Sequence, residues 1–121
     1  MQTAKDTRKY IRHEVIDFSI ILPNTSKLPV SALIVDVGLG GVALRTREKF
    51  PPEEMVTITV GQNNGSPISF HGEIRYCDKR EKESTYAVGV QFKPANQEER
   101  ALIANFINNA FQRNSQPNLA V

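Results

Sequence analysis

Two arginines near the N-terminus, Arg8 and Arg12, are the residues whose type and spacing most directly suggest chemistry. A guanidinium is a planar fork of donors that can hold a phosphate through two hydrogen bonds, and the same fork matches the O6 and N7 acceptors of guanine. The pair therefore fits a ligand that contains both guanine and phosphate. Two solvated surface arginines could have the same spacing by chance, so the spacing alone does not show that the pair binds a ligand.

A second candidate is the segment Asp36-Val37-Gly38-Leu39-Gly40-Gly41. The Asp36 carboxylate could accept hydrogen bonds from the N1 and N2 donors of a guanine, and glycines allow a ligand close to the backbone. Three glycines in four positions also lower the cost of positive backbone dihedrals, so we expect a loop or tight bend. The alternative is an aspartate that begins a turn and bonds its own backbone.

Four further residues are possible accessory contacts, namely Lys9, His13, Arg45 and Arg75. Lys9 lies between the two arginines, and His13 follows Arg12 directly and could contact a ligand held there. Arg45 and Arg75 could add positive potential near the site, although an exposed strand face explains them equally well.

Catalytic and metal chemistry find no support in the sequence. Neither His13 nor His71 has a cysteine or carboxylate at the spacing of a zinc site, and Cys77 is a lone cysteine without an identifiable basic partner. The glycine segment lacks the Gly-Lys-Ser/Thr ending and the following helix of a phosphate-binding loop. The sequence therefore predicts no catalytic residue, no metal and no cofactor.

Short strands must position these candidates. Period-2 alternation and turn-forming residues predict strands at 15–22, 30–35, 42–46, 55–60, around 68–76, and 85–92. In the first strand, Ile16, Phe18, Ile20 and Leu22 form one strongly apolar face, and the phenylalanines and tyrosines mostly fall at core-like positions. Asn64-Gly65 favours a hairpin, and the charged residues 78–83 are expected to form an exposed connection.

One C-terminal helix is expected to follow the strands. Asn96 is a suitable N-cap with Glu99 three residues later, and an apolar stripe of helical period continues through Ile103, Phe106, Ile107, Ala110 and Phe111. Such a stripe would cover an apolar face. Six strands and one helix predict a small antiparallel barrel or sandwich that the helix closes.

Composition limits the broad class of protein. The chain has 121 residues, enough for one domain, and its net charge of +2 is too small for long-range attraction to nucleic acid. No apolar run is long enough to span a bilayer, so we expect a soluble, cytoplasmic protein without membrane insertion. We expect a flexible basic segment at 1–13, a barrel with its helix at 14–114, and a tail at 115–121.

The order of these features resembles the PilZ domain family, whose pattern is Arg-x-x-x-Arg followed by Asp/Asn-x-Ser-x-x-Gly. The first motif is matched at Arg8 and Arg12, and the second at Asp36 and Gly41. The segment 86–92, which ends in Gly-Val-Gln-Phe, is similar to the late strand that precedes the family's closing helix. The resemblance covers the chain from residue 8 to residue 111.

The resemblance implies a mainly β fold, a six-stranded antiparallel β-barrel closed by one C-terminal α-helix, with cyclic di-GMP as ligand. It implies that Arg8 and Arg12 grip phosphate and guanine edges, and that Asp36, Gly38 and Gly41 lie in the second binding motif. Gly38 departs from the family, because a serine usually stands there. The missing hydroxyl removes one hydrogen bond of roughly 0.5–1.5 kcal/mol, about three- to tenfold in affinity.

Three functions follow as expectations. The leading one is a cyclic di-GMP receptor in bacterial motility or biofilm regulation, which reorders its N-terminal segment on binding and signals to an unidentified partner protein. The alternative is a PilZ adaptor that acts through protein contacts without nucleotide, as the missing serine would allow. A small barrel that binds RNA or single-stranded DNA is disfavoured because its aromatic residues have core-like positions. We expect no enzymatic activity.

Overall fold

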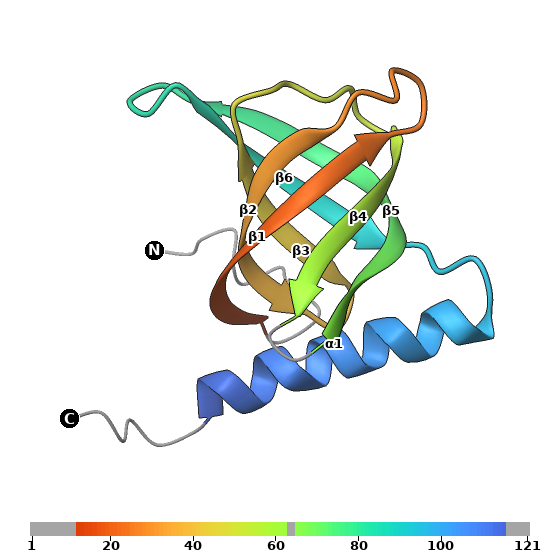
Figure 1. The fold of residues 1–121 in the computed structure, drawn as a ribbon. Coiled ribbons are helices and arrows are strands. Elements are labelled where there is room, and N and C mark those ends of the chain that lie inside the picture. The colour runs from red at the N-terminus through yellow and green to blue at the C-terminus, as the bar shows by residue number, and fades with distance from the viewer. Residues whose placement is uncertain (1–11, 63–64, 116–121) are drawn as a thin grey trace.

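A computed structural model describes residues 12–62 and 65–115 of the chain. It contains a helix and six strands, which are β1 (Arg12–Pro23), β2 (Val30–Gly38), β3 (Gly41–Thr46), β4 (Met55–Gln62), β5 (Gly65–Arg80), β6 (Thr85–Phe92) and α1 (Gln97–Ser115). The strands pair antiparallel and close into a barrel in the order β1-β2-β3-β6-β5-β4 (Figure 1). The predicted fold class, a six-stranded antiparallel barrel closed by a C-terminal helix, is confirmed.

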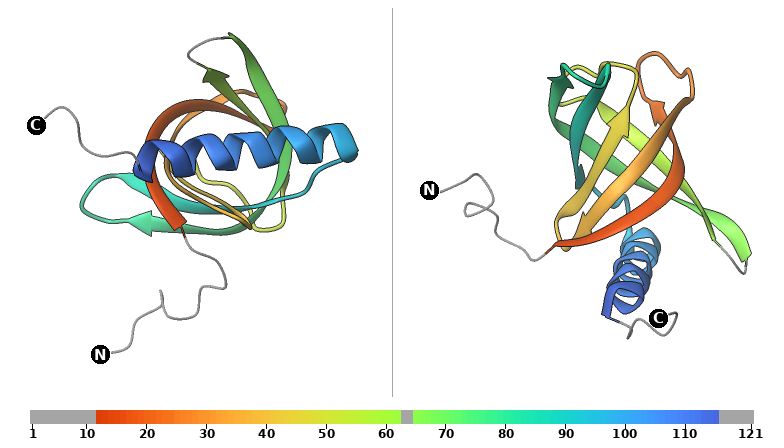
Figure 2. Two further views of the ribbon diagram at one scale, coloured as in Figure 1. Left: turned by 90° about the horizontal axis from the view of Figure 1, so that it is seen from below. Right: turned by 90° about the vertical axis from the view of Figure 1, so that its left-hand side faces the viewer.

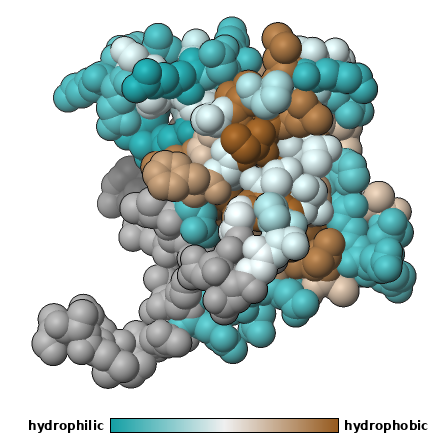
Figure 3. All heavy atoms as spheres, in the orientation of Figure 1, coloured by the Kyte–Doolittle hydropathy of each residue, from teal (hydrophilic) through white to brown (hydrophobic). Residues whose placement is uncertain are grey.

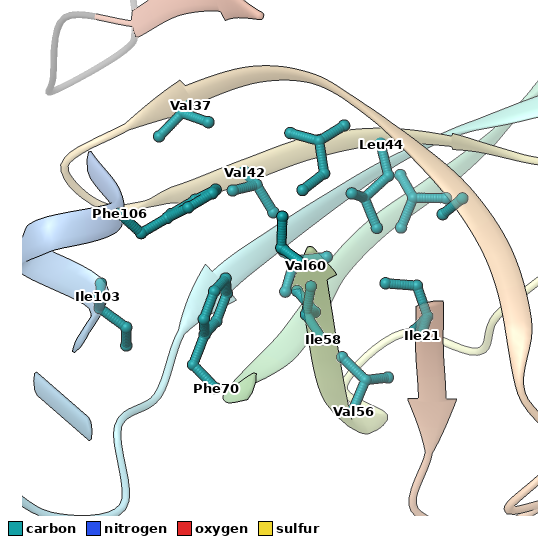
Figure 4. Close-up of a cluster of buried hydrophobic side chains, with 14 of the residues drawn as sticks. Ile21, Val37, Val42, Leu44, Val56, Ile58, Val60, Phe70, Ile103 and Phe106 are labelled. Carbon is teal, nitrogen blue, oxygen red and sulfur yellow. The ribbon is translucent and has the colours of Figure 1, made fainter. Parts of the chain in front are cut away.

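Alternating side chains fill the inside of the barrel. On β4, Val56, Ile58 and Val60 are buried and the threonines between them are partly exposed, because successive residues of a strand point to opposite faces. Branched aliphatic residues from all six strands meet in one cluster (Figure 4). The core residues that the strands and the β3–β4 connection contribute are Ile21, Ala32, Ile34, Val37, Val42, Leu44, Phe50, Val56, Ile58, Val60, Phe70, Ile74, Val88 and Val90.

On β1, the side chains of Phe18, Ile20 and Leu22 lie outside the barrel, which corrects the expected core-like position of Phe18. Phe18 is 83% exposed, whereas Ile21 and Ser19 point inward. The reason is register. Ile21 pairs with Ile58 of β4, whose side chain is fully buried, and this pairing fixes the inner face of β1 from Ser19 to Pro23. The buried Ser19 hydroxyl donates a hydrogen bond to the Ala32 carbonyl at 3.2 Å, so its polar group is satisfied.

Strand β5 is longer than the sequence suggested. The expected exposed connection at 78–83 is wrong at its first residues, because β5 continues to Arg80 and Asp78 pairs with Ala87 of β6. The turn comprises residues 81–84. Arg80 donates to the Glu83 carboxylate at 3.0 Å across this turn. Asp78 and Lys79 are both exposed on this two-stranded extension, so a polar sequence does not end the strand.

Helix α1 lies across one end of the barrel (Figure 2) and contacts β1, β2 and β5. Its N-cap is confirmed, because the Glu99 backbone N–H donates to Asn96 Oδ1 at 2.8 Å. The predicted stripe buries Ile103, Phe106, Ile107 and Ala110 against the barrel. The ring of Phe106 lies 5.2 Å from that of Phe70, between ring centroids, so the helix and the barrel share one core.

A polar contact also ties α1 to the barrel. The Glu99 carboxylate accepts hydrogen bonds from the His71 backbone N–H at 2.5 Å and contacts His71 Nδ1 at 2.9 Å. Burial raises the pKa of Glu99, but hydrogen bonds from the His71 backbone and ring and from the Ala95 backbone outweigh it, so the pKa lies below its ordinary value. The charged carboxylate therefore stabilises the closed barrel.

No helix in the described ranges combines the length and the apolar character that crossing a membrane requires.

Candidate functional site

The pairing of β1 with β2 brings the two sequence motifs together. Arg12 lies directly opposite Gly38 in the antiparallel ladder, and Glu14 lies opposite Asp36. Both chain segments reach the end of the barrel that α1 covers (Figure 1). Arg12 belongs to β1, while Arg8 and Lys9 lie outside the described residues. The pairing therefore places Arg12, the first described residue, beside the glycine segment.

A bulge in β2 turns Asp36 to the outer face of the barrel. Ile34 and Val37 are both fully buried although they are three residues apart, so the alternation skips one residue between them. Asp36 pairs with Ala43, which is partly exposed beside the buried Val42. Bulges commonly redirect a side chain next to a functional site. The carboxylate thus lies on the outer wall of the barrel.

A row of outward-facing residues runs across neighbouring strands from Asp36 to Tyr76, an aromatic residue for which the sequence had predicted a core-like position. Ala43 pairs with Gly89, and Gly89 pairs with Tyr76. A Cβ atom added at Gly89 would lie 2.1 Å from Tyr76 Cε2, so the Tyr76 ring covers the glycine. Tyr76 is 45% exposed. The only sequence signal for this placement was the glycine itself, which leaves room for a ring on the facing strand.

The glycine segment forms a tight connection, as predicted, but for a different reason. Strand β2 extends to Gly38 and β3 begins at Gly41, so only residues 39–40 lie between the strands. None of the described glycines has a positive φ, so left-handed geometry does not explain them. A Cβ at Gly41 would lie 1.9 Å from the Val90 carbonyl oxygen, which makes Gly41 a requirement of close backbone approach to β6.

Of the possible accessory residues, His13 lies next to Arg12 in β1, opposite Val37. Arg45 lies four residues along β3 from Gly41, about 13 Å away, and its guanidinium pairs with Glu83 at 3.4 Å. Arg75 pairs with Glu73 at 3.5 Å. His13 therefore lies beside the two motifs, whereas Arg45 and Arg75 form ion pairs with Glu83 and Glu73.

The remaining reactive residue types serve the fold. Cys77 Sγ accepts a hydrogen bond from the Phe50 backbone N–H at 3.4 Å, and His71 contacts Glu99 as described above. In the part of the chain that the structure describes, no three His, Cys, Asp or Glu side chains gather closely enough to hold a metal ion.

Solved structures share this barrel. The PilZ domain with c-di-GMP of YcgR from Escherichia coli superimposes with a TM-score of 0.68 and 13% identity, over 88% of this chain and 93% of that one. The Bacillus subtilis inhibitor of motility MotI/DgrA gives 0.64 and 17%, over 97% of this chain and 55% of its own. The MrkH–c-di-GMP complex of K. pneumonia gives 0.65 and 17%, over 93% and 53%. At these identities the likeness shows the fold, and the chain spans about half of MotI and MrkH.

No curated protein matches the sequence of the chain. The PilZ domain family, in contrast, matches residues 6–109, a range that contains both motifs and the whole barrel. Because this match covers most of the sequence, the chain belongs to the PilZ domain family.

Proposed function

We propose that this protein is a receptor for cyclic di-GMP, which binds on the outer wall of the barrel where the start of β1 meets the end of β2. The observation that carries the proposal is the pairing of Arg12 with Gly38, because it joins two motifs that lie far apart in the sequence. The solved PilZ domain of YcgR contains c-di-GMP, and so does the MrkH complex. Their barrels superimpose on this one.

In this proposal Arg8 and Arg12 hold the phosphates and the guanine edges of the ligand. Each guanidinium can make two parallel charge-assisted hydrogen bonds, which an ammonium group cannot. Because Arg12 is the first residue of β1, its backbone is fixed by the ladder, and Arg8 would approach from the segment before it. Lys9 and His13 would add secondary contacts from the same segment.

Asp36 would bind a guanine base through the N1 and N2 donors. The bulge directs this carboxylate outward, and Gly38 and Gly41 leave the adjoining backbone without side chains. Tyr76 lies in the same outward row, where its exposed ring would offer a stacking surface to a second base. Arg45 and Arg75 are not part of this proposed site.

Binding, rather than a chemical step, is the proposed activity. The basic N-terminal segment would order around the ligand, and the surface that it forms would be recognised by a partner protein. This converts the concentration of a second messenger into a new binding surface. Incubation with cyclic di-GMP should therefore return the dinucleotide intact, which chromatography of the mixture can check.

Calorimetric titration with cyclic di-GMP tests the proposal. We expect saturable binding with a defined stoichiometry and poor competition by GTP or linear GMP, since the site requires guanine and phosphate groups in fixed geometry. Equal affinity for GTP would count against the site. Stronger binding to RNA or single-stranded DNA, with a steep salt dependence, would favour a nucleic-acid-binding barrel.

The second candidate is an adaptor that acts through protein contacts without nucleotide. The observation in its favour is Gly38, where the family usually has a serine hydroxyl. A folded protein that gives no heat with cyclic di-GMP would support this candidate and exclude the receptor.

A further inference from the structure

A groove lies at the end of the barrel opposite α1. It has a volume of about 940 Å³ and lies between the β1–β2 turn and the β3–β4 connection, over the start of β2. Along β2, eight residues separate Val30 at the groove from Gly38, roughly 26 Å at the rise of a strand. Figure 1 shows both connections at the top of the barrel, away from the helix. The groove is therefore separate from the proposed nucleotide site and does not depend on it.

The groove has a strongly apolar and open wall. Phe18 is 83% exposed and Leu28 is 68% exposed, and the side chain of Leu33 lies beside Phe18 because the two residues pair across β1 and β2. Figure 3 shows hydrophobic side chains on the face of the molecule that β1 crosses. The register of β1 turns Phe18 outward beside the buried Ser19, and no other part of the described chain covers its side chain. Exposed apolar surface of this kind marks an interaction site.

Cations border the apolar wall on its other side. Arg45 pairs with Leu33 across β2 and β3, so Phe18, Leu33 and Arg45 form one outward row from apolar to positive. Arg47 and Lys49 follow along the same border. Neither of these two has a carboxylate within ion-pair distance among the residues that the structure describes.

The acidic residues of the groove weaken this positive border only partly. Glu54 accepts hydrogen bonds from the Thr25 backbone N–H at 2.9 Å and from its hydroxyl at 2.7 Å, and these bonds lower the pKa of Glu54. Its charge is thus held against the β1–β2 turn. Glu48 is exposed and lies between Arg47 and Lys49. Arg45 is already paired with Glu83, so Arg47 and Lys49 are the cations of the groove that can pair with an incoming acidic group.

The shape and chemistry favour a short peptide over other occupants. A small-molecule site encloses its ligand and converges several polar groups on it, whereas Phe18 and Leu28 stand open to solvent. A lipid surface requires a protruding apolar patch with a broad cationic field, whereas this surface is hollowed and the net charge is only +2. A peptide segment with apolar and acidic side chains complements both borders.

We propose that this groove is a docking site for a short segment of a partner protein that presents apolar side chains together with aspartate or glutamate. The apolar side chains pack against Phe18, Leu28 and Leu33, and the carboxylates pair with Arg47 and Lys49. Docking at this end leaves the opposite end free for nucleotide.

A library of random dodecapeptides displayed on phage, selected on the intact protein, tests the proposal. We expect enrichment of peptides that combine acidic and apolar residues. A synthetic peptide from that set, followed by fluorescence anisotropy, should bind Phe18→Ser and Arg47→Glu on the order of tenfold more weakly than the unaltered protein. Two matched controls, Ile20→Ser on the same strand and Lys82→Glu on the β5–β6 turn, should bind normally, because neither residue lines the groove.

Thermal unfolding shows whether each variant is folded. If Phe18→Ser does not fold, Arg47→Glu alone tests the proposal. Enrichment without an acidic bias, or equal binding by the groove and control variants, overturns the proposal. Sedimentation that shows a dimer lost in Phe18→Ser would assign the groove to a second copy of the chain instead. Vesicles of phosphatidylglycerol that bind the protein through Phe18, with no enriched peptide, would assign it to a lipid surface.

Discussion

Arg8 and Arg12 are the residues on which the proposed binding depends most. Each truncation to alanine removes several charge-assisted hydrogen bonds of roughly 1.5–3 kcal/mol apiece, so we expect Arg8→Ala and Arg12→Ala each to abolish detectable binding of cyclic di-GMP in calorimetry. Both arginines precede the first apolar alternation of the sequence, so thermal unfolding of the free protein should hardly change. Arg12→Lys should restore little affinity. Unchanged affinity in either alanine variant would remove the arginine pair from the site.

Gly38 is the residue at which this chain departs from its family, and its geometry gives the sign of a substitution. We expect Gly38→Ser to tighten cyclic di-GMP binding roughly three- to tenfold through one added hydrogen bond. Gly38 does not have a positive φ, so a side chain there meets no left-handed strain. Gly38→Ala is the matched control and should leave affinity unchanged. If serine has no more effect than alanine, the hydroxyl has no role in this protein.

At the scale of elements, the closure of β3 against β6 depends on Gly41. A Cβ there would overlap the Val90 backbone, which cannot move as a flexible side chain could. We expect Gly41→Ala to lower the free energy of unfolding by about 1–3 kcal/mol or more, measured by urea denaturation. Gly61→Ala is the control, because a Cβ at Gly61 has nothing within 4 Å. Equal stability of the two variants would show that the contact between β3 and β6 tolerates a side chain at Gly41.

The attachment of α1 should depend on pH through Glu99. The folded-state pKa of Glu99 lies below its ordinary value of 4.5, so its contribution is present above that value and is lost as the pH falls through the folded-state pKa. Glu99→Gln should cost about 1–3 kcal/mol at about pH 5 and markedly less at about pH 3. Urea denaturation of the unaltered protein and of Glu99→Gln at both pH values measures this loss of stability. A loss that is the same at both pH values would contradict the proposed role of the Glu99 charge.

The alternation of apolar residues predicted the elements and their number well. Period-2 runs and turn residues identified all six strands, and the Asn96 cap with its apolar stripe identified α1. These signals are local, so they can be read from neighbouring residues. The two motifs were also local, and their meeting followed from the pairing of consecutive strands.

The sequence-based predictions were wrong where the pairing of strands far apart in the sequence determines the structure. The exposed position of Phe18 follows from the register of β1 against two strands at once, which no alternation within β1 could reveal. The extension of β5 through Asp78 depends on β6, and the placement of Tyr76 over Gly89 depends on the pairing of the same two strands. The outward turn of Asp36 required a bulge that has no sequence signature here.

At the scale of the whole molecule, the barrel would present nucleotide at one end and a protein segment at the other. Strands β1 and β2 run continuously between the Arg12–Gly38 pair and the groove. A receptor needs two such surfaces, one for the messenger and one for the protein that responds.

Nuclear magnetic resonance of the ¹⁵N-labelled protein, titrated with cyclic di-GMP, tests the central claim most directly. The amide signals of Arg12 and of residues 36–41 should shift and saturate, while those of the groove at 28–33 and 47–50 should move little. Loss of these shifts in Arg12→Ala would confirm the site. No saturable shift at residues 36–41, or shifts confined to the groove, would contradict the proposed binding of cyclic di-GMP where β1 meets β2.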